Sequence, residues 1–211
     1  MRLVPTPAEI IELLRQSGAL CEGHFECLNG LHTDTYLDMA LALRCPTHQR
    51  MLSVALSRLL REQTEIRVVR PQLSIVAVAA AALPIAWGLC EALRAEQVYW
   101  VERPSPDAPL RLRQFFEQNP GEKVVLVDDV LRAGRLVAEA RGLFEGFGAE
   151  VVAVAAVAHQ PAPGAADLGA LPVYTLARLE STYYAAPPAC ELCRKGMPLI
   201  RRERAARAIG V

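Results

Sequence analysis

The sequence predicts an α/β fold in which a mostly parallel sheet is flanked by helices, with an N-terminal helix and a β-hairpin flap, or hood, beside it. Three observations lead to this prediction. Short apolar runs typical of buried strands alternate along the chain with amphipathic helical patterns. The Asn29-Gly30 pair separates two short mixed segments, which is a strong hairpin signal. The apolar run of residues 124–127 ends in Asp128-Asp129, which is typical of a parallel strand reaching the ligand-binding edge of a sheet.

The bulk composition restricts the classes of protein. A chain of 211 residues suits a single domain, which we expect to comprise a hood (residues 1–45), a core (46–180) and a tail (181–211). The 23 basic and 23 acidic residues balance without long blocks of one sign, so we expect neither nucleic acid nor an anionic membrane as a partner. The alanine-rich residues 76–85 fall well short of the ~20 apolar residues of a spanning helix.

The six cysteines, at positions 21, 27, 45, 90, 190 and 193, are interpreted as reduced thiols. The first seven residues lack the apolar region of a secretory signal, which argues against export and so against a disulfide framework. We therefore expect a cytoplasmic protein.

The N-terminal half predicts a helix, the hood and a second helix. Apolar residues recur at helical spacing over residues 7–17, with Gly18 as a stop signal. The hairpin is expected within residues 22–38. Residues 48–61 carry apolar side chains on one face, which predicts an amphipathic helix covering the sheet.

A strand, helix and strand unit should follow. We expect a strand at residues 66–69, an alanine-rich helix to about residue 93 and a strand at residues 97–101. Three prolines mark residues 104–109 as an irregular loop.

The C-terminal half continues the alternation. The buried strand of residues 124–127 is followed by a helix at residues 136–147 that ends before Gly148. Apolar strands are then expected at residues 151–158 and 173–176.

The acidic pair and the turn after it form the most informative motif. Two adjacent carboxylates at the carboxyl end of a strand can bind ribose hydroxyls or assist a metal ion. Backbone N–H groups of the following turn and helix N-terminus can bind a phosphate. The pattern therefore predicts a ribose-phosphate site. The alternative is that Asp128 or Asp129 merely caps the next helix.

This segment, residues 124–134, resembles the phosphoribosyl diphosphate (PRPP) motif of the type I phosphoribosyltransferases. Residues 18–20, 23–25 and 30–34 resemble the N-terminal flap of bacterial orotate phosphoribosyltransferases. Glu102-Arg103 and residues 113–115 resemble the ends of that family's mobile catalytic loop, and residues 190–193 with 196–199 resemble a C-terminal segment of one branch. The resemblance spans roughly residues 17–200 and implies the type I phosphoribosyltransferase fold.

The resemblance implies transfer of ribose 5-phosphate from PRPP to a pyrimidine base in pyrimidine nucleotide synthesis, with Mg²⁺ carried by PRPP and a homodimer as the working form. It makes Arg103, Asp128 and Asp129 the catalytic candidates. The substrate-binding candidates are Arg111, Arg113, Arg132, Ala133, Gly134, Arg135, Leu136, His159 and Gln160.

Several segments depart from the family pattern. The phosphate loop, residues 131–136, retains Gly134 but lacks the usual Thr and Ser, although Arg132 and Arg135 could bind a phosphate. Residues 70–75, aligned with the diphosphate loop, contain no glycine. His159-Gln160 replaces an orotate-binding arginine, and the mobile loop has no lysine, which leaves Arg103 as the best substitute.

These departures leave three hypotheses open. The first is an active phosphoribosyltransferase. The second is a non-catalytic homologue that keeps the fold as a nucleotide-sensing or partner-binding module. The third is a transferase that uses another base, since His159 and Gln160 suit a neutral ring. Fold alone does not choose among them.

The cysteines and histidines offer a further alternative. Cys190 and Cys193 could form half of a zinc site, with Cys21, His24 and Cys27 as further ligands. We favour reduced surface thiols and expect no metal ligands in the chain. His24 and His32 lie in the hood, where each could contact a base or satisfy a turn.

Overall fold

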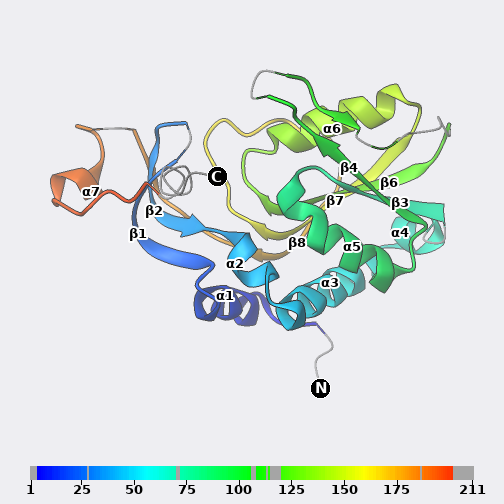
Figure 1. The fold of residues 1–211 in the computed structure, drawn as a ribbon, viewed down its shortest axis with the longest axis horizontal. Coiled ribbons are helices and arrows are strands. Elements are labelled where there is room, and N and C mark those ends of the chain that lie inside the picture. The colour runs from blue at the N-terminus through cyan, green and yellow to red at the C-terminus, as the bar shows by residue number, and fades with distance from the viewer. Residues whose placement is uncertain are drawn as a thin grey trace.

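The computed structural model describes residues 4–27, 29–69, 72–105, 108–112, 114, 120–185 and 187–201. Figure 1 shows a central sheet between two layers of helices, with a smaller hairpin and a short C-terminal helix to one side. Within the described residues, no helix combines the length and apolarity that a bilayer span requires.

The central sheet has six strands in the order β5-β4-β3-β6-β7-β8. Its strands are β3 (Leu73–Ala77), β4 (Gln97–Glu102), β5 (Arg111–Leu112), β6 (Lys123–Leu131), β7 (Glu150–His159) and β8 (Val173–Arg178). All neighbouring strands are parallel except β4 and β5, which confirms the predicted mostly parallel sheet. The chain moves outward from β3 to β4 and then returns to place β6 on the other side of β3. The carboxyl ends of β3 and β6 therefore form the switch point at which such sheets bind ligands.

Helices cover both faces of this sheet, as Figure 1 shows. One face carries α1 (Pro7–Gln16), α3 (Pro46–Arg61) and α5 (Leu83–Leu93), and the other carries α6 (Arg135–Gly146). A short α2 (Met39–Leu43) links the hood to α3. Alternate residues of β6 serve the two faces, because Val125 and Val127 belong to the hydrophobic cluster with α3 and α5, whereas Leu126 belongs to the cluster with Phe144 of α6.

Local sequence explains the helix ends. At α1, the Thr6 hydroxyl accepts a hydrogen bond from the Glu9 N–H at 3.2 Å, and the Glu9 carboxylate accepts one from the Thr6 N–H at 2.6 Å. This capping box satisfies two N–H groups that the helix leaves unpaired. The predicted first helix is confirmed. Where α5 crosses α3, a Cβ at Gly88 would lie 2.4 Å from the Ser53 hydroxyl, so glycine permits the close approach of the two helices.

The strand expected at residues 66–69 is wrong, because this segment belongs to helix α4 (Thr64–Val69). Ile66 is buried while Val68 is 73% exposed, a distribution that suits one face of a helix rather than a buried strand. The first strand of the unit is β3 instead, and it ends at a short 3₁₀ turn, η2 (Ala80–Ala82), that leads into α5.

This correction also moves the candidate diphosphate loop. Ser74 and Ile75 lie inside β3, and Arg70 and Pro71 lie outside the described residues. The segment that follows the carboxyl end of β3 is residues 78–82, which has the sequence Val-Ala-Ala-Ala-Ala. It also contains no glycine.

Strand β6 is longer than its apolar pattern predicts. It continues through both acids to Leu131, and Asp128 pairs with Ala156 of β7 in the parallel ladder. Helix α6 begins after Gly134, whose φ of 68° lies in the left-handed region, and no side chain caps it. The alternative that an aspartate caps this helix is therefore wrong.

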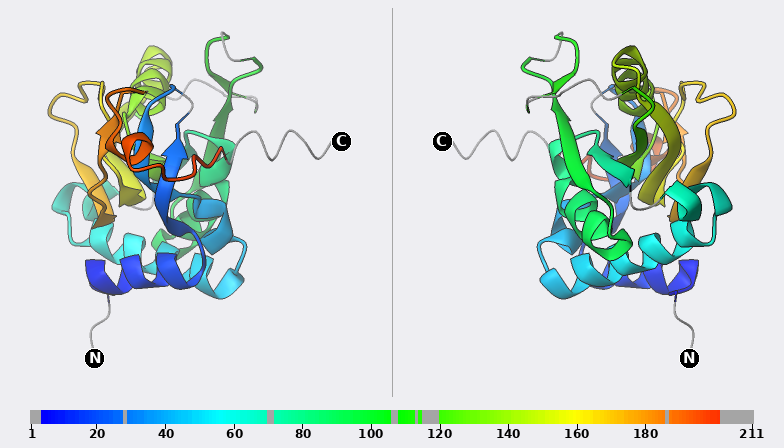
Figure 2. Two further views of the ribbon diagram at one scale, coloured as in Figure 1. Left: turned by 90° about the vertical axis from the view of Figure 1, so that its left-hand side faces the viewer. Right: turned by 90° about the vertical axis from the view of Figure 1, so that its right-hand side faces the viewer.

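The hood contains more of the chain than the N-terminal hairpin. Strands β1 (Leu20–Glu26) and β2 (His32–Leu37) pair antiparallel, as predicted, and β9 (Tyr183–Tyr184) adds to β2. Figure 2 shows the C-terminal segment, with helix α7 (Glu191–Arg194), running beside this hairpin. Ile200 then forms a parallel bridge with Phe25 of β1. Residues from both ends of the sequence thus build one small sheet.

Candidate active site

A cavity of about 470 Å³ lies between the hood and the carboxyl ends of β6 and β7. Its volume is typical of small-molecule sites. The hood contributes Cys27, Asn29, Thr33, Thr35, Tyr36, Leu37, Asp38, Met39 and Tyr183. The core contributes Asp129, Arg132, Ala133, Arg135, Gln160, Ala162 and Pro163. Five of the residues chosen from the sequence, Asp129, Arg132, Ala133, Arg135 and Gln160, therefore meet at one cavity beside the switch point.

The two acids have different surroundings. Asp129 lines the cavity, whereas Asp128 is buried beneath it at 9% exposure and its Oδ1 accepts a hydrogen bond from the Asp129 N–H at 2.9 Å. Burial, followed by the neighbouring Asp129 carboxylate, raises the pKa of Asp128 well above its ordinary value, and the Arg132 guanidinium opposes this shift. Asp129 is thus the carboxylate that is placed to meet a ligand.

Arg132 and Gln160 join the core to the hood. The Arg132 Nε donates to the Gln160 Oε1 at 3.1 Å, and its Nη2 donates to the Leu37 carbonyl of β2 at 2.7 Å. The Gln160 amide, only 2% exposed, donates to the Ser181 hydroxyl at 2.8 Å. These bonds hold the loop after β6 directly under the hood and fix the height of the cavity.

The loop between β6 and α6 presents its backbone to the cavity. Ala133 lines it, and its carbonyl accepts a hydrogen bond from Ala166 N–H at 2.7 Å, which anchors the loop on its outer side. Gly134 adopts a positive φ that L residues with side chains rarely adopt. Leu136 lies in the first turn of α6, is partly exposed and is outside the cavity lining. The first N–H groups of α6 are available to an anion, as at any helix N-terminus.

The arginines of the expected mobile loop lie elsewhere. Arg103 donates to the Ala108 carbonyl and forms an ion pair with Glu139 of α6. The Leu110 N–H also donates to Glu139, and this bond, followed by the Arg103 guanidinium, lowers the pKa of Glu139 against the effect of burial. Arg111 pairs with Glu102, and Arg113 lies outside the described residues. In this conformation Arg103 and Arg111 secure their segment to α6 and β4 and do not line the cavity.

His159 ends β7 at the ligand-binding edge, but its ring is directed elsewhere. Its Nδ1 lies 3.3 Å from Nη1 of Arg178 on β8. Burial and then this guanidinium lower the pKa of His159 below its ordinary value. Gln160, the next residue, occupies the cavity wall instead.

His24 and His32 do not line the cavity. They face each other and the two tail cysteines, with the His24 Nε2 2.8 Å from the His32 Nδ1. Burial, followed by the nearby His24 ring, lowers the pKa of His32. The hypothesis that either histidine contacts a base is wrong for this geometry.

Sequence reasoning missed the hood residues that do line the cavity, such as Thr33, Thr35 and Tyr183. Thr33 and Thr35 lie two residues apart on β2, and this alternation is the signal that could have placed them on one face. Tyr183 carries no comparable local signal, because it reaches the cavity only by pairing with β2.

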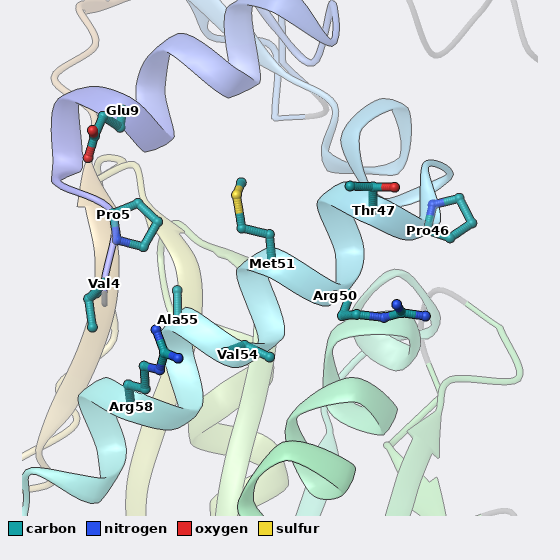
Figure 3. A pocket seen from close by; sticks show the side chains of 10 residues that line it. All are labelled: Val4, Pro5, Glu9, Pro46, Thr47, Arg50, Met51, Val54, Ala55 and Arg58. Atoms are coloured by element: carbon teal, nitrogen blue, oxygen red, sulfur yellow. The ribbon is translucent and has the colours of Figure 1, made fainter. Parts of the chain in front are cut away.

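A second cavity, of about 890 Å³, opens between the start of α1 and the outer face of α3 (Figure 3). Apolar side chains such as Met51 and Val54 line it, with Arg50 and Arg58 also present. Its carboxylate, Glu9, is engaged in the capping box of α1. This groove lies away from the carboxyl ends of the strands, so the smaller cavity is the candidate active site despite its size.

Comparisons with known proteins identify the family of the chain. No protein-family model matches the chain. An orotate phosphoribosyltransferase of Caldicellulosiruptor bescii is 32% identical over 191 residues, which cover 90% of this chain and 94% of that protein. One from Carboxydothermus hydrogenoformans is 31% identical over 194 residues, covering 92% and 95%. The chain belongs to the orotate phosphoribosyltransferase family.

Solved structures support the same fold for this member of the family. The crystal structure of orotate phosphoribosyltransferase from Aeropyrum pernix has a TM-score of 0.64 at 22% identity, covering 81% of this chain and 93% of that one. Adenine phosphoribosyltransferase from Thermoanaerobacter pseudethanolicus has a TM-score of 0.56 at 17% identity, covering 69% and 88%. The predicted type I phosphoribosyltransferase fold and the resemblance to the orotate family are both confirmed.

Proposed function

We propose that the cavity binds PRPP, as its Mg²⁺ complex, together with orotate, and that the chain transfers ribose 5-phosphate to this pyrimidine base. One observation carries the proposal. The acidic pair, the loop after it and His159-Gln160 at the carboxyl end of β7 were chosen from the sequence as a ribose-phosphate and base site, and Asp129, the loop residues and Gln160 line one cavity beside the switch point of the sheet.

The acidic pair suits the ribose and the magnesium ion of the substrate complex. The Asp129 carboxylate faces the cavity, and carboxylate oxygens are suitable partners for ribose hydroxyls and for hydrated Mg²⁺. Asp128 supports it from below by accepting the Asp129 N–H. Mg²⁺ would neutralise charge on the diphosphate, and the contribution of the chain is to orient the ribose.

The loop after β6 suits the 5′-phosphate. Arg132 and Arg135 line the cavity beside the backbone of Ala133, and guanidinium groups make strong charge-assisted bonds to phosphate. These two cations supply locally what the Thr and Ser of the family pattern supply by hydroxyl groups. The base would then lie under the hood, between Gln160 and the hydroxyl-bearing residues of β2.

Arg103 remains the proposed stabiliser of the leaving diphosphate, and Arg111 and Arg113 its neighbours. Because Arg103 is paired with Glu139, Arg103 has to exchange this ion pair for the diphosphate when substrate binds. Closure of the segment of residues 103–111 would exclude water, which otherwise hydrolyses PRPP. We also propose that the working form is a homodimer. The molar mass of the purified protein, measured by light scattering after size-exclusion chromatography, tests this.

Calorimetric titration with PRPP and Mg²⁺, with and without orotate, tests the proposal. We expect saturable heat with PRPP and formation of orotidine 5′-monophosphate and diphosphate when orotate is added. The double variant Asp128→Asn with Asp129→Asn should lose PRPP binding while it remains folded. Absence of both heat and thermal shift at saturating PRPP would favour the non-catalytic hypothesis. Heat without product from orotate, but with product from another base, would favour the third hypothesis.

A further inference from the structure

Four side chains that could ligate a metal ion meet in the hood, away from the cavity. They are His24 of β1, His32 of β2, Cys190 immediately before α7 and Cys193 within α7. One ligand atom from each lies within 4.8 Å of all the others. His24 and His32 are 2% and 3% exposed and Cys190 is fully buried, which contradicts the expectation of surface thiols.

We infer that His24, His32, Cys190 and Cys193 bind one structural Zn²⁺ ion that locks the C-terminal segment onto the N-terminal hairpin. Two thiolates and two imidazoles form a donor set typical of structural zinc, and four protein ligands leave no open position for catalysis. This site has no part in the proposed transfer reaction and stands independently of it.

The distances suit a tetrahedral ion. With zinc bonds of about 2.3 Å to sulfur and about 2.05 Å to nitrogen, tetrahedral geometry places N and S about 3.6 Å apart and two N atoms about 3.3 Å apart. The His24 Nε2 lies 3.6 Å from both sulfur atoms, and the His32 Nδ1 lies 3.3 Å from the Cys193 Sγ. The two nitrogens are 2.8 Å apart, so the rings separate by about half an ångström when an ion enters.

The outer contacts orient the ligands. The His24 Nδ1 lies 2.9 Å from the Met197 carbonyl, which can only accept, so Nδ1 carries the proton. This leaves the lone pair of the neutral ring on Nε2, directed at the cluster. A hydrogen bond from the other ring nitrogen to a carbonyl is the usual support for a metal-bound histidine.

The backbone around the cysteines favours the same geometry. Cys190 immediately precedes α7 and Cys193 lies within it three residues later, and both sulfurs lie 3.6 Å from the His24 Nε2. Gly196 then turns the chain with a φ of 67°, and this turn brings the Met197 carbonyl to His24. The turn and the two cysteines together form a compact loop that presents two thiolates to the hairpin.

A single ion fits better than an iron–sulfur cluster with the same donors. In such a cluster the two histidines bind one iron and the two cysteines bind the other, so the pairs are separated. Here each histidine nitrogen is within 3.6 Å of a cysteine sulfur, which leaves space for one shared ion.

The hood needs such a link. Phe25, Cys190 and Leu192 are buried, but none of them belongs to either hydrophobic cluster of the described core. Other links between the hairpin and the C-terminal segment, among the described residues, include a two-residue strand, hydrogen bonds between Asp34 and Thr182, the backbone bonds of Ile200 and a partly exposed Arg201–Glu26 pair. Small apolar units of this kind usually require a metal ion or a disulfide for stability.

The first test is the metal content of the full-length protein, purified without an affinity tag that binds metal. We expect about one zinc ion per chain. Zinc-edge X-ray absorption should then show two sulfur and two nitrogen neighbours at about 2.3 Å and about 2.0–2.1 Å. Replacement by Co²⁺ should give the visible absorption of a tetrahedral thiolate site. Zinc bound with a shell of oxygen ligands only would overturn the proposal.

Variants identify the ligands. Cys190→Ser, Cys193→Ser and His24→Ala should each lose most of the zinc and melt at a lower temperature than the parent protein. Cys21→Ser is the matched control. Cys21 lies on β1, like His24, but outside the cluster, so this variant should retain a full complement of zinc. If the ligand variants fail to fold, a chelator added to the parent protein gives the same comparison. The proposal is overturned if the protein folds without zinc, gains none from added Zn²⁺ and melts identically with and without a chelator, or if Cys190 and Cys193 prove to form a disulfide.

Discussion

The central sheet and the hood are built on different physical principles. The central strands of the sheet are mostly apolar, such as the fully buried β3, and helices cover both faces of the sheet. The hood is a three-stranded sheet with one strand of two residues, and it depends on polar and sulfur-containing side chains far apart in sequence. His24 and the Met197 carbonyl that it contacts are 173 residues apart. The comparison teaches that the elements of the core follow from local sequence patterns, whereas the hood above the cavity depends on contacts between residues far apart in the sequence.

The largest expected effect separates the two regions by removing one phenylalanine from each. Phe144 is fully buried between α6 and the sheet, so Phe144→Ala should cost about 3–5 kcal/mol of global stability. Phe25 is equally buried but lies in the hood, so Phe25→Ala should raise hydrogen exchange in β1 and β2 while β6 and β7 remain protected. Exchange measured by mass spectrometry checks this. Equal loss of protection in β6 and β7 for both variants would mean that the two regions unfold as one.

The next effect is at the junction between the regions. Arg132→Ala removes the hydrogen bonds to Gln160 and to the Leu37 carbonyl, and it should cost about 1–2 kcal/mol because Arg132 is partly solvated. Arg135→Ala is the control, since it removes a cation from the same cavity wall without removing these bonds. Urea denaturation measures both. Equal stability of the two variants would show that the hydrogen bonds of Arg132 add nothing to the free energy of unfolding beyond the effect of its charge.

Replacement of Asp128 is expected to increase the stability of the protein, whereas the substitutions above decrease it. Because its pKa is raised in the folded protein, the folded state binds more protons than the unfolded state, and stability falls as pH rises from the ordinary carboxyl pKa to the raised one. Asp128→Asn removes this loss, so the variant should melt above the parent at neutral pH. The difference should shrink as the pH is lowered toward about 4. A difference that is independent of pH contradicts the burial argument.

The smallest effect concerns the sheet scaffold alone. Thr6→Ala removes the capping box of α1 and should cost about 1 kcal/mol, whereas Thr6→Ser should retain most of the stability. Neither substitution should change zinc content or PRPP affinity, because α1 lies away from both sites. Urea denaturation and metal analysis together check the prediction, and altered zinc content in the alanine variant would contradict the separation of the regions.

Much of the core could be predicted from the sequence. The helices α1, α3 and α6, the hairpin and the strands from β6 to β8 follow from apolar periodicity and turn residues, because burial on one or two faces leaves a local pattern. The strand predicted at residues 66–69 was wrong because isoleucine and valine favour strands locally, whereas here one face of a short helix packs on the core. Strand β6 is longer than its apolar run because its pairing with β7 continues past the two acids to Leu131.

The candidate site was predictable only on its core side. Asp129, Arg132 and Gln160 follow strands and could be located by topology and resemblance. Tyr183 and the cluster of His24, His32, Cys190 and Cys193 could not, because their proximity depends on how the C-terminal segment returns to β1 and β2. From the sequence, His24 could be named as a possible ligand only beside Cys21 and Cys27, and His32 was not named at all.

The return of the C-terminal segment to the hairpin also fixes the order of events during synthesis. The strands from β3 to β8 are synthesised before residue 180, but the Ile200 N–H reaches the His24 carbonyl only after residue 200 has emerged from the ribosome. The N-terminal hairpin is therefore made first and completed last. A nascent or prematurely terminated chain that lacks residues beyond about 185 would contain every residue that lines the cavity, but its hairpin would lack the backbone bonds of Ile200 and the cysteines of the cluster.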